Sequence, residues 1–150
     1  MQTDEEILRG RLDQIRDVLP EMNAEEIKVL SAALPIDHVR VIRAPHTGLI
    51  MAKVRDCFDT EFFLGEVLVT RAEVEYEGQR GQATLMGDLP SAALLAAVLE
   101  ALCLKGDAHY FESAHSICRQ AMQRFVARRK QQSRLVAATR VDFKSMAVES

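Results

Sequence analysis

The stretch that decides the fold is EFFLGEVLVTRAEVEYEGQRGQATLMGDLPSAALLAAVLEALCL, residues 61–104. Within it, every second side chain of Glu73-Val74-Glu75-Tyr76-Glu77 is charged, which is typical of a strand with one face in water. Residues 92–104 contain no helix breaker and one charge, Glu100, and so predict a buried central helix. Short loops between consecutive strands indicate an antiparallel meander. Strands are predicted over 61–70, 73–77 and 82–86, with a turn over 78–81.

Two short helices are predicted before the sheet, as a hairpin over residues 4–34. A capping box marks the start of each helix, since Thr3 is followed by Glu6 and Asn23 by Glu26 at the required spacing. Helical periodicity ends with the second helix.

After Pro35 the apolar residues recur with a period of two, and the sheet therefore begins there. Residues 44–48, which include Pro45 and Gly48, have the composition of a turn. The pattern predicts a strand, a turn and a return strand over 38–43, 44–48 and 49–54.

Helices return over residues 90–139, and a tail follows over 140–150. A turn at Gly106-Asp107 separates the central helix from a long one, whose apolar stripe fails at the polar stretch 128–134. This pattern predicts that the last helix projects beyond its own core. The expected fold for residues 1–150 is a single α+β domain: an amino-terminal helical hairpin, an antiparallel meander sheet over 38–86, a buried central helix and a long carboxy-terminal helix.

Composition excludes several classes of protein. The chain has 150 residues, a net charge of −3 and 48% apolar residues, enough to fill one core. No apolar run approaches the ~20 residues that a membrane span needs. The acidic start does not resemble a signal peptide, so a cytoplasmic protein without membrane contact is expected. Three cysteines without a Cys-x-x-Cys pair disfavour a disulfide framework and a cysteine zinc site.

The charge is segregated along the chain. Residues 111–134 carry six positive side chains and one negative one, which leaves −8 for the remainder. Such a face can meet phosphates, a nucleic acid or an acidic partner, or it can be a solvated helix face. A nucleic acid is the weakest option because no aromatic residue follows Phe125 in this stretch. The predicted basic surface consists of Arg124, Arg128, Arg129, Lys130 and Arg134.

No sequence pattern identifies a self-contained catalytic or metal site. His115 and Cys118 lie three residues apart on one predicted helix, with His109 nearby, but Cys118 belongs to the apolar stripe and a closed zinc site needs four ligands. The glycines match neither a phosphate-binding loop nor a dinucleotide fingerprint, and there is no G-x-S-x-G element. We therefore predict no catalytic residue and no metal ligand.

Gly65-Glu66 is unusual within a predicted strand. Glycine weakens a strand unless a bulge or a close backbone approach requires it, and Glu66 interrupts the surrounding apolar run. Two interpretations stay open at this point: a bulge with its acid in water, or a backbone contact with a neighbouring chain.

Four blocks of the sequence, in their order and spacing, resemble the PhnG family, the small subunits of bacterial carbon-phosphorus lyase systems for phosphonate degradation. The similarity extends from the first helix to about Met146. Its most specific elements are R-x-x-x-T-G-L, G-E-x-L-V-T-R-A and R-V-D-F. The four blocks are Val41–Leu49, Gly65–Ala72, Gly81–Asp88 and Thr139–Phe143.

The resemblance implies participation in a complex rather than solitary catalysis. PhnG-like proteins act with PhnH, PhnI and PhnL to form α-D-ribose 1-methylphosphonate 5-triphosphate from MgATP and methylphosphonate, with release of adenine. They belong to a core complex that includes PhnJ. Glycosyl transfer is attributed to the PhnI-like subunit and iron-sulfur radical cleavage to PhnJ, so this chain is expected to bind no cofactor by itself, and MgATP is a substrate of the complex.

Contacts with substrate or a partner are predicted within the shared blocks, at His46, Gly65, Glu66, Thr70, Arg71, Arg140, Asp142 and Phe143. A subunit should also expose apolar area, for which Phe62, Phe63, Leu135 and Val136 are candidates. Our hypothesis is that the last helix and its tail dock on a neighbouring chain, either a different subunit or, by exchange, a second copy in a self-dimer. The alternative is a free-standing protein that binds phosphorylated ligands or nucleic acid through the basic helix.

Overall fold

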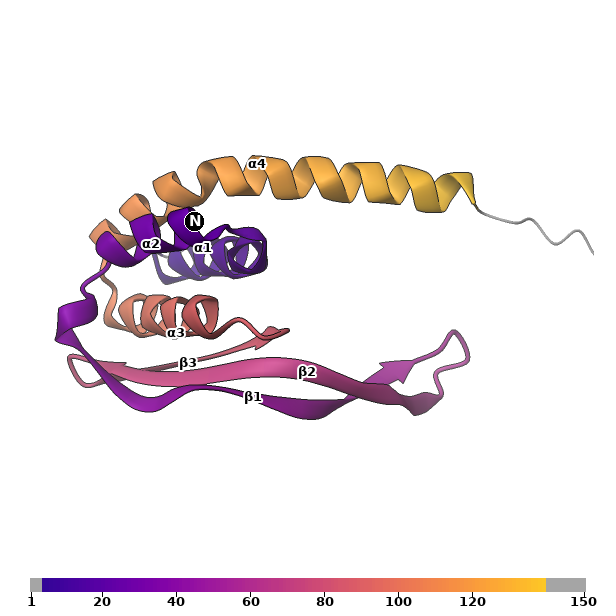
Figure 1. Ribbon diagram of the computed structural model, residues 1–150, viewed down its shortest axis with the longest axis horizontal. Coiled ribbons are helices and arrows are strands. Elements are labelled where there is room, and N and C mark those ends of the chain that lie inside the picture. Colours follow the sequence, from indigo (N-terminus) through magenta and orange to yellow (C-terminus); the bar gives the residue numbers. More distant parts are fainter. Residues whose placement is uncertain (1–3, 140–150) are drawn as a thin grey trace, which may run out of the picture.

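The computed structural model describes residues 4–139, and its helices and strands form an α+β fold, which confirms the predicted class (Figure 1). The sheet forms one side of the molecule. Helix α3 covers one face of the sheet, α1 and α2 cover α3, and α4 lies outermost (Figure 1). Along the chain the elements are α1 (Asp4–Val18), the 3-10 turn η1 (Leu19–Glu21), α2 (Ala24–Ala32), the 3-10 turn η2 (Ile36–His38), β1 (Val39–Arg55), β2 (Glu61–Tyr76), β3 (Gln79–Met86), α3 (Pro90–Lys105) and α4 (Ala108–Ala138).

The strands form an antiparallel meander, as predicted, in the order β1-β2-β3. The two strands predicted over 61–70 and 73–77 are one continuous strand, β2. The predicted turn over 44–48 is wrong, because β1 runs without interruption from Val39 to Arg55. Pro45 lies in a register shift between Arg43 and His46 on an edge strand, where its missing N–H removes no ladder hydrogen bond. What the composition indicated as two short strands and a turn is one long strand with bulges.

The hairpin between β2 and β3 turns at Glu77-Gly78, where both residues have positive φ. This is the backbone that a two-residue hairpin loop needs. The predicted turn over 78–81 is therefore too long, and Gly81 lies within β3, buried against α3. A Cβ atom at Gly81 would lie 2.0 Å from the carbonyl oxygen of Ala97, so glycine permits the close approach of β3 to α3.

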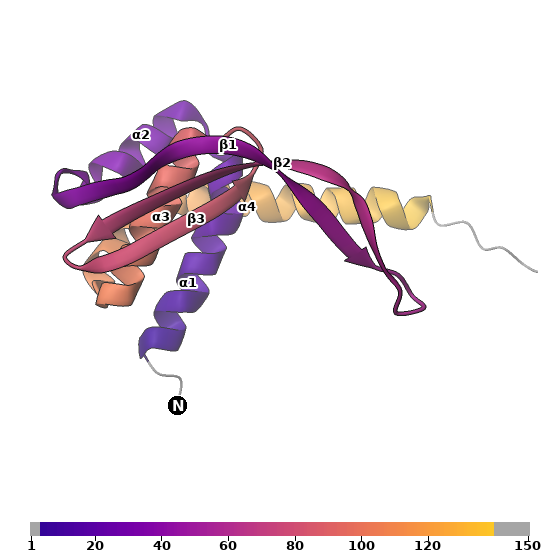
Figure 2. The ribbon, with the colours of Figure 1, turned by 90° about the horizontal axis from the view of Figure 1, so that it is seen from below.

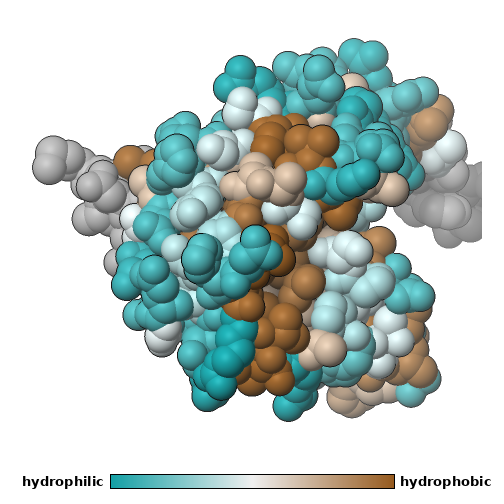
Figure 3. Space-filling model, turned by 60° about the vertical axis from the view of Figure 1, so that its left-hand side comes forward, coloured by the Kyte–Doolittle hydropathy of each residue, from teal (hydrophilic) through white to brown (hydrophobic). Residues whose placement is uncertain are grey.

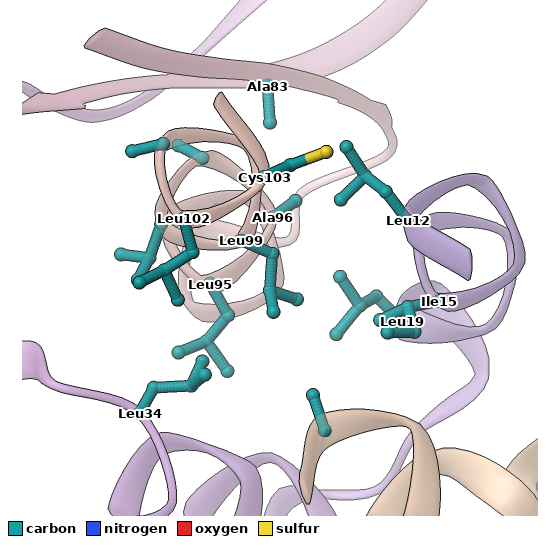
Figure 4. Close-up of a cluster of buried hydrophobic side chains, with 14 of the residues drawn as sticks. Leu12, Ile15, Leu19, Leu34, Ala83, Leu95, Ala96, Leu99, Leu102 and Cys103 are labelled. Atoms are coloured by element: carbon teal, nitrogen blue, oxygen red, sulfur yellow. The ribbon is translucent and has the colours of Figure 1, made fainter. Parts of the chain in front are cut away.

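The core is built around α3, which confirms the predicted buried central helix. Ala97 and Ala101 lie against Gly81 of β3 and allow the sheet to approach the helix. On the other side of α3, Leu99 extends towards Leu12, Ile15 and Leu19 of α1 and η1, and Leu95 towards Leu34 (Figure 4). Each such side chain contributes about 1.5–3 kcal/mol by leaving water.

Local signals mark two helix boundaries as the sequence predicts. The capping box of α2 is present, since the Asn23 side chain accepts a hydrogen bond from the Glu26 amide and Glu26 accepts one from the Asn23 amide. Helix α3 ends at Gly106, whose φ of 84° is the left-handed conformation expected there. The other predicted box begins at Thr3, which lies outside the described residues.

Two parts of the fold extend beyond the packed layers (Figures 1 and 2). Strand β3 pairs only with residues 69–76 of β2, so residues 48–68 form a two-stranded hairpin, which we call the arm. Helix α4 is buried only as far as Ala121, and residues 127–138 are exposed, which confirms the predicted projection. Both extend in the same direction from the body (Figures 1 and 2).

The opposite end of the molecule shows a narrow strip of apolar side chains between hydrophilic ones (Figure 3). Among the helices within residues 4–139, none is both long enough and apolar enough to cross a membrane.

Candidate functional site

The first two shared blocks, about twenty residues apart along the chain, lie side by side at the base of the arm. His46 is directly opposite Arg71 in the register, and Thr47 is opposite Thr70. Directly opposed residues share one face of a sheet, so His46 and Arg71 lie on the same face, both exposed. The predicted contact residues His46, Thr70 and Arg71 therefore belong to one place in the structure.

Thr70 has a structural role at the base of the arm. It is fully buried on the face that packs towards α3. Its hydroxyl donates to the carbonyl oxygen of Gly87 at 2.6 Å and accepts from the amide of Leu89 at 2.9 Å. Both partners precede α3, so Thr70 joins the base of the arm to the start of the central helix.

Arg71 reaches across to β3 on the outer face, where its guanidinium donates to the Gln82 side-chain oxygen at 3.0 Å. It lines a shallow, polar pocket of about 380 Å³ together with Arg16, Thr84 and Glu100. With His46 nearby, this face presents hydrogen-bond donors to a carboxylate or phosphate brought by another molecule.

Arg16 and Glu100 cover the free edge of β3 at the same pocket. The Arg16 guanidinium donates to the Gln82 carbonyl oxygen at 3.2 Å, and the Gln82 amide donates to a Glu100 oxygen at 3.3 Å. The two side chains also pair with each other at 3.4 Å. The sequence offered one signal for this arrangement, the lone charge of Glu100 in an apolar helix, but nothing in it pointed to Arg16 or Gln82.

A bulge at Gly65 shapes the arm. The register shifts between Ala52 and Lys53, opposite Gly65 and Phe63, and leaves Leu64 without a partner in the ladder. Of the two open interpretations, the bulge is therefore present, and Gly65 has the φ of 150° that favours glycine. Glu66 lies opposite Met51 and is exposed.

The arm presents a large apolar surface. Eight of its large apolar residues are 43–83% exposed. At roughly 200 Å² for a fully exposed side chain of this size, they present on the order of 1,000 Å² in total over the two faces and the tip of the arm, compared with about 300–600 Å² for the largest patch on a typical monomer. These residues are Leu49, Ile50, Met51, Phe58, Phe62, Phe63, Leu64 and Leu68.

The predicted basic surface on α4 is partly neutralised within the chain. Arg124 pairs with Glu26, and Arg128 pairs with Glu21. The pKa of Glu26 is lowered, first by the hydrogen bond from the Asn23 amide and then by Arg124. Further along, the guanidinium of Arg129 lies 5.8 Å from the centre of the Phe125 ring, while Lys130 and Arg134 form no ion pair with any residue from 4 to 139.

Cys118, the buried member of the His-Cys group, packs as a core residue. Its sulfur lies 3.8 Å from that of Met22, and burial raises the pKa of its thiol to about 11. His109 contacts the ring of Tyr110 edge to face. Residues 4–139 contain no group of three or more side chains arranged to hold a metal ion. The predicted contacts Arg140, Asp142 and Phe143 lie outside the described residues.

A larger pocket of about 600 Å³ lies where α1 meets the junction of α3 and α4. Leu8, Cys103 and Leu104 line its apolar part, and an ion pair between Arg11 and Glu112 borders it. None of the shared blocks contributes to this pocket, so its position does not coincide with the base of the arm.

Comparison with known proteins identifies the family. The sequence matches the family described as phosphonate metabolism protein PhnG over residues 11–148. The chain belongs to the PhnG family. A relative from Rhizobium meliloti (strain 1021), named alpha-D-ribose 1-methylphosphonate 5-triphosphate synthase subunit PhnG, is 37% identical over 111 residues, covering 72% of this chain and 69% of that protein. The resemblance read from the four blocks is thus confirmed, and three of those PhnG blocks, Val41–Leu49, Gly65–Ala72 and Gly81–Asp88, meet at the base of the arm.

Proposed function

We propose that this PhnG-family chain is an accessory subunit of a synthase that forms α-D-ribose 1-methylphosphonate 5-triphosphate from MgATP and methylphosphonate, with release of adenine. The observation that carries the proposal is the relative named as a subunit of that synthase, at 37% identity. In this proposal PhnI-, PhnH- and PhnL-like chains act with it in the transfer, and a PhnJ-like chain joins them in the core complex. MgATP is then a substrate of the assembly, located in the cytoplasm.

The physical contribution that we propose for the chain is surface. The arm supports this because its apolar area is larger than a monomer usually exposes. We propose that a partner subunit binds at the outer face of the base of the arm. There His46 and Arg71 offer hydrogen-bond donors to an acidic side chain or to a phosphate of the substrate.

Adenine release tests the function. The PhnI-, PhnH- and PhnL-like chains are mixed with MgATP and methylphosphonate, with and without this chain, and free adenine is measured by chromatography. We expect adenine only when this chain is present. An unchanged rate after its omission would refute the role of a required subunit.

The proposed contact face is tested in the same assay with Arg71→Ala. Its matched control is Arg80→Ala, because Arg80 is exposed on the same outer sheet face but at the end away from the arm. We expect Arg71→Ala to reduce adenine release and co-purification with the PhnI-like chain about tenfold, and Arg80→Ala to leave both unchanged. Equal behaviour of the two variants would exclude the base of the arm as the contact.

A further inference from the structure

The arm and the far end of α4 each carry apolar side chains that no described element covers. We propose that the arm of one copy packs on residues 126–138 of α4, which we call the α4 end, of a second copy. The proposal concerns self-association and stands independently of the proposed subunit role.

The inner face of the arm continues a surface that a helix covers elsewhere. Thr70 and Val74 of β2 are buried on the face that α3 covers. Beyond the amino-terminal end of α3 the same face continues into the arm, where it carries two cross-strand pairs, Leu49 with Leu68 and Met51 with Glu66. The apolar members of these pairs are exposed. A helix is therefore the element that this face lacks.

The α4 end is a helical segment whose apolar side chains are not covered by a sheet. Leu135 and Val136, which are adjacent on the helix, are 62% and 66% exposed. The arm and the α4 end therefore each supply what the other is missing, a sheet face and a helix with apolar side chains.

The helix that covers the arm must come from another molecule. Helix α4 packs on α1 and α2, which together with α3 separate it from the sheet (Figure 1). Because α4 is continuous over 31 residues, its far end stays on the opposite side of these layers from the arm of the same chain (Figures 1 and 2). In a two-fold pair, by contrast, each arm meets the partner's helix, and the contact is made twice.

Charge also favours this pairing. The arm has four acidic and two basic residues, whereas the α4 end has four basic residues and no acidic one, and of these four Arg128 is paired with Glu21 of its own chain. Within residues 4–139, Glu66 forms no ion pair, and neither do Lys130 and Arg134. Glu66 lies among the apolar side chains of the inner face, where a cation from the partner's helix would pair with it.

The size of the surface is sufficient. On the inner face Leu49, Met51, Phe63 and Leu68 present on the order of 400 Å², and Leu135 and Val136 of the α4 end add on the order of 300 Å². In a two-fold pair each copy contributes both, on the order of 700 Å², which is close to the ~800 Å² per partner of a standard stable interface. A two-fold pair covers two arms and two helix ends.

The first experiment measures the oligomeric state of the full chain by light scattering after size exclusion, over a range of concentrations. We expect a dimer. Glu66→Lys should weaken it about tenfold or more, as should the double change Lys130→Glu with Arg134→Glu, because each places like charges together. Combining all three changes should restore the dimer, since the charges are then exchanged.

The matched controls are Asp13→Lys and Lys28→Glu, which reverse exposed charges on α1 and α2. They should leave the dimer unchanged, and circular dichroism should show that every variant is folded. A chain that stays monomeric, or a triple variant that does not regain the dimer, would overturn the proposal and leave the arm to a different protein.

A cross-link provides a second measurement that needs no charge change. Leu49→Cys in one chain and Leu135→Cys in another, both with Cys57→Ser, are mixed and oxidised with copper phenanthroline. We expect a disulfide-linked pair of the two different chains, identified by mass. Val29→Cys on α2 replaces Leu49→Cys as the control and should not cross-link. Equal yields from both mixtures would contradict the proposed contact.

Discussion

Replacing Gly81 by alanine should destabilise the protein strongly. The new Cβ would lie 2.0 Å from the Ala97 carbonyl oxygen and 2.5 Å from the Ala101 amide nitrogen, both in the backbone of α3. Neither atom can turn aside as a side chain can, so β3 and α3 must separate. Overpacking of this kind costs about 1–3 kcal/mol, and the backbone on both sides places Gly81→Ala near 3 kcal/mol. At about 2–4 °C per kcal/mol for a chain of this size, the melting temperature should fall by about 6–12 °C.

The same substitution at Gly10 is the control. Gly10 is exposed in α1 and a Cβ there would meet nothing within 4 Å. Alanine favours a helix over glycine by up to about 1 kcal/mol, so Gly10→Ala should raise the melting temperature by a few degrees. Thermal unfolding followed by circular dichroism measures both variants at equal chain concentration. If Gly81→Ala melted within about 2 °C of the parent chain, close packing of β3 on α3 would not be the reason for this glycine.

Three further predictions concern a hydroxyl, a carboxylate and a thiol. Thr70→Val removes the donor and acceptor that join the arm to the start of α3, and should cost about 1–3 kcal/mol in urea unfolding, with Thr70→Ser closer to the parent chain. The pKa of Glu26 is lowered from 4.5, so its charge stabilises the fold above that pH, and this contribution is lost as the pH falls through the folded value; Glu26→Gln keeps the cap but not the ion pair with Arg124. Between about pH 7 and about pH 3, the free energy of unfolding should therefore depend less on pH in Glu26→Gln than in the parent chain. An equal pH dependence in both chains would contradict a stabilising charge on Glu26. Finally, Cys118 should resist alkylation in the folded chain and react once urea unfolds it, because burial raises the pKa of its thiol to about 11; mass spectrometry detects the label, and equal labelling in both states would be inconsistent with a buried thiol.

The sequence predicts the structure correctly where a few neighbouring residues decide it. The capping box at Asn23 and the left-handed end at Gly106 are local arrangements, and both lie where expected. The turn predicted at Pro45 is wrong. Proline interrupts a strand where its missing N–H would remove a ladder hydrogen bond, but at a bulge in an edge strand no such bond is lost. The predicted turn also wrongly includes Gly81, which must be a glycine because of its contact with Ala97 in α3, sixteen residues further along the chain.

Only part of the candidate site could be predicted from the sequence. His46 and Arg71 could be named from shared motifs, but their adjacency depends on two bulges in β1 that offset the register by one residue each. Arg16 was not predicted because its partners lie 66 and 84 residues away, and no local pattern marks such a contact.

The sequence by itself therefore determined the α+β class, the order of helices and strands, the buried central helix and the family. Periodicity and caps suffice for the first three, since they act between residues one to four positions apart, whereas the family follows from the four shared blocks. Only the tertiary structure decided that the sheet has three strands, that the pairing of β3 with β2 extends no further than residue 69, and that the arm and the α4 end are exposed. Each of these depends on which distant surface lies opposite a given residue, because burial and strand pairing are properties of two segments together and not of either one.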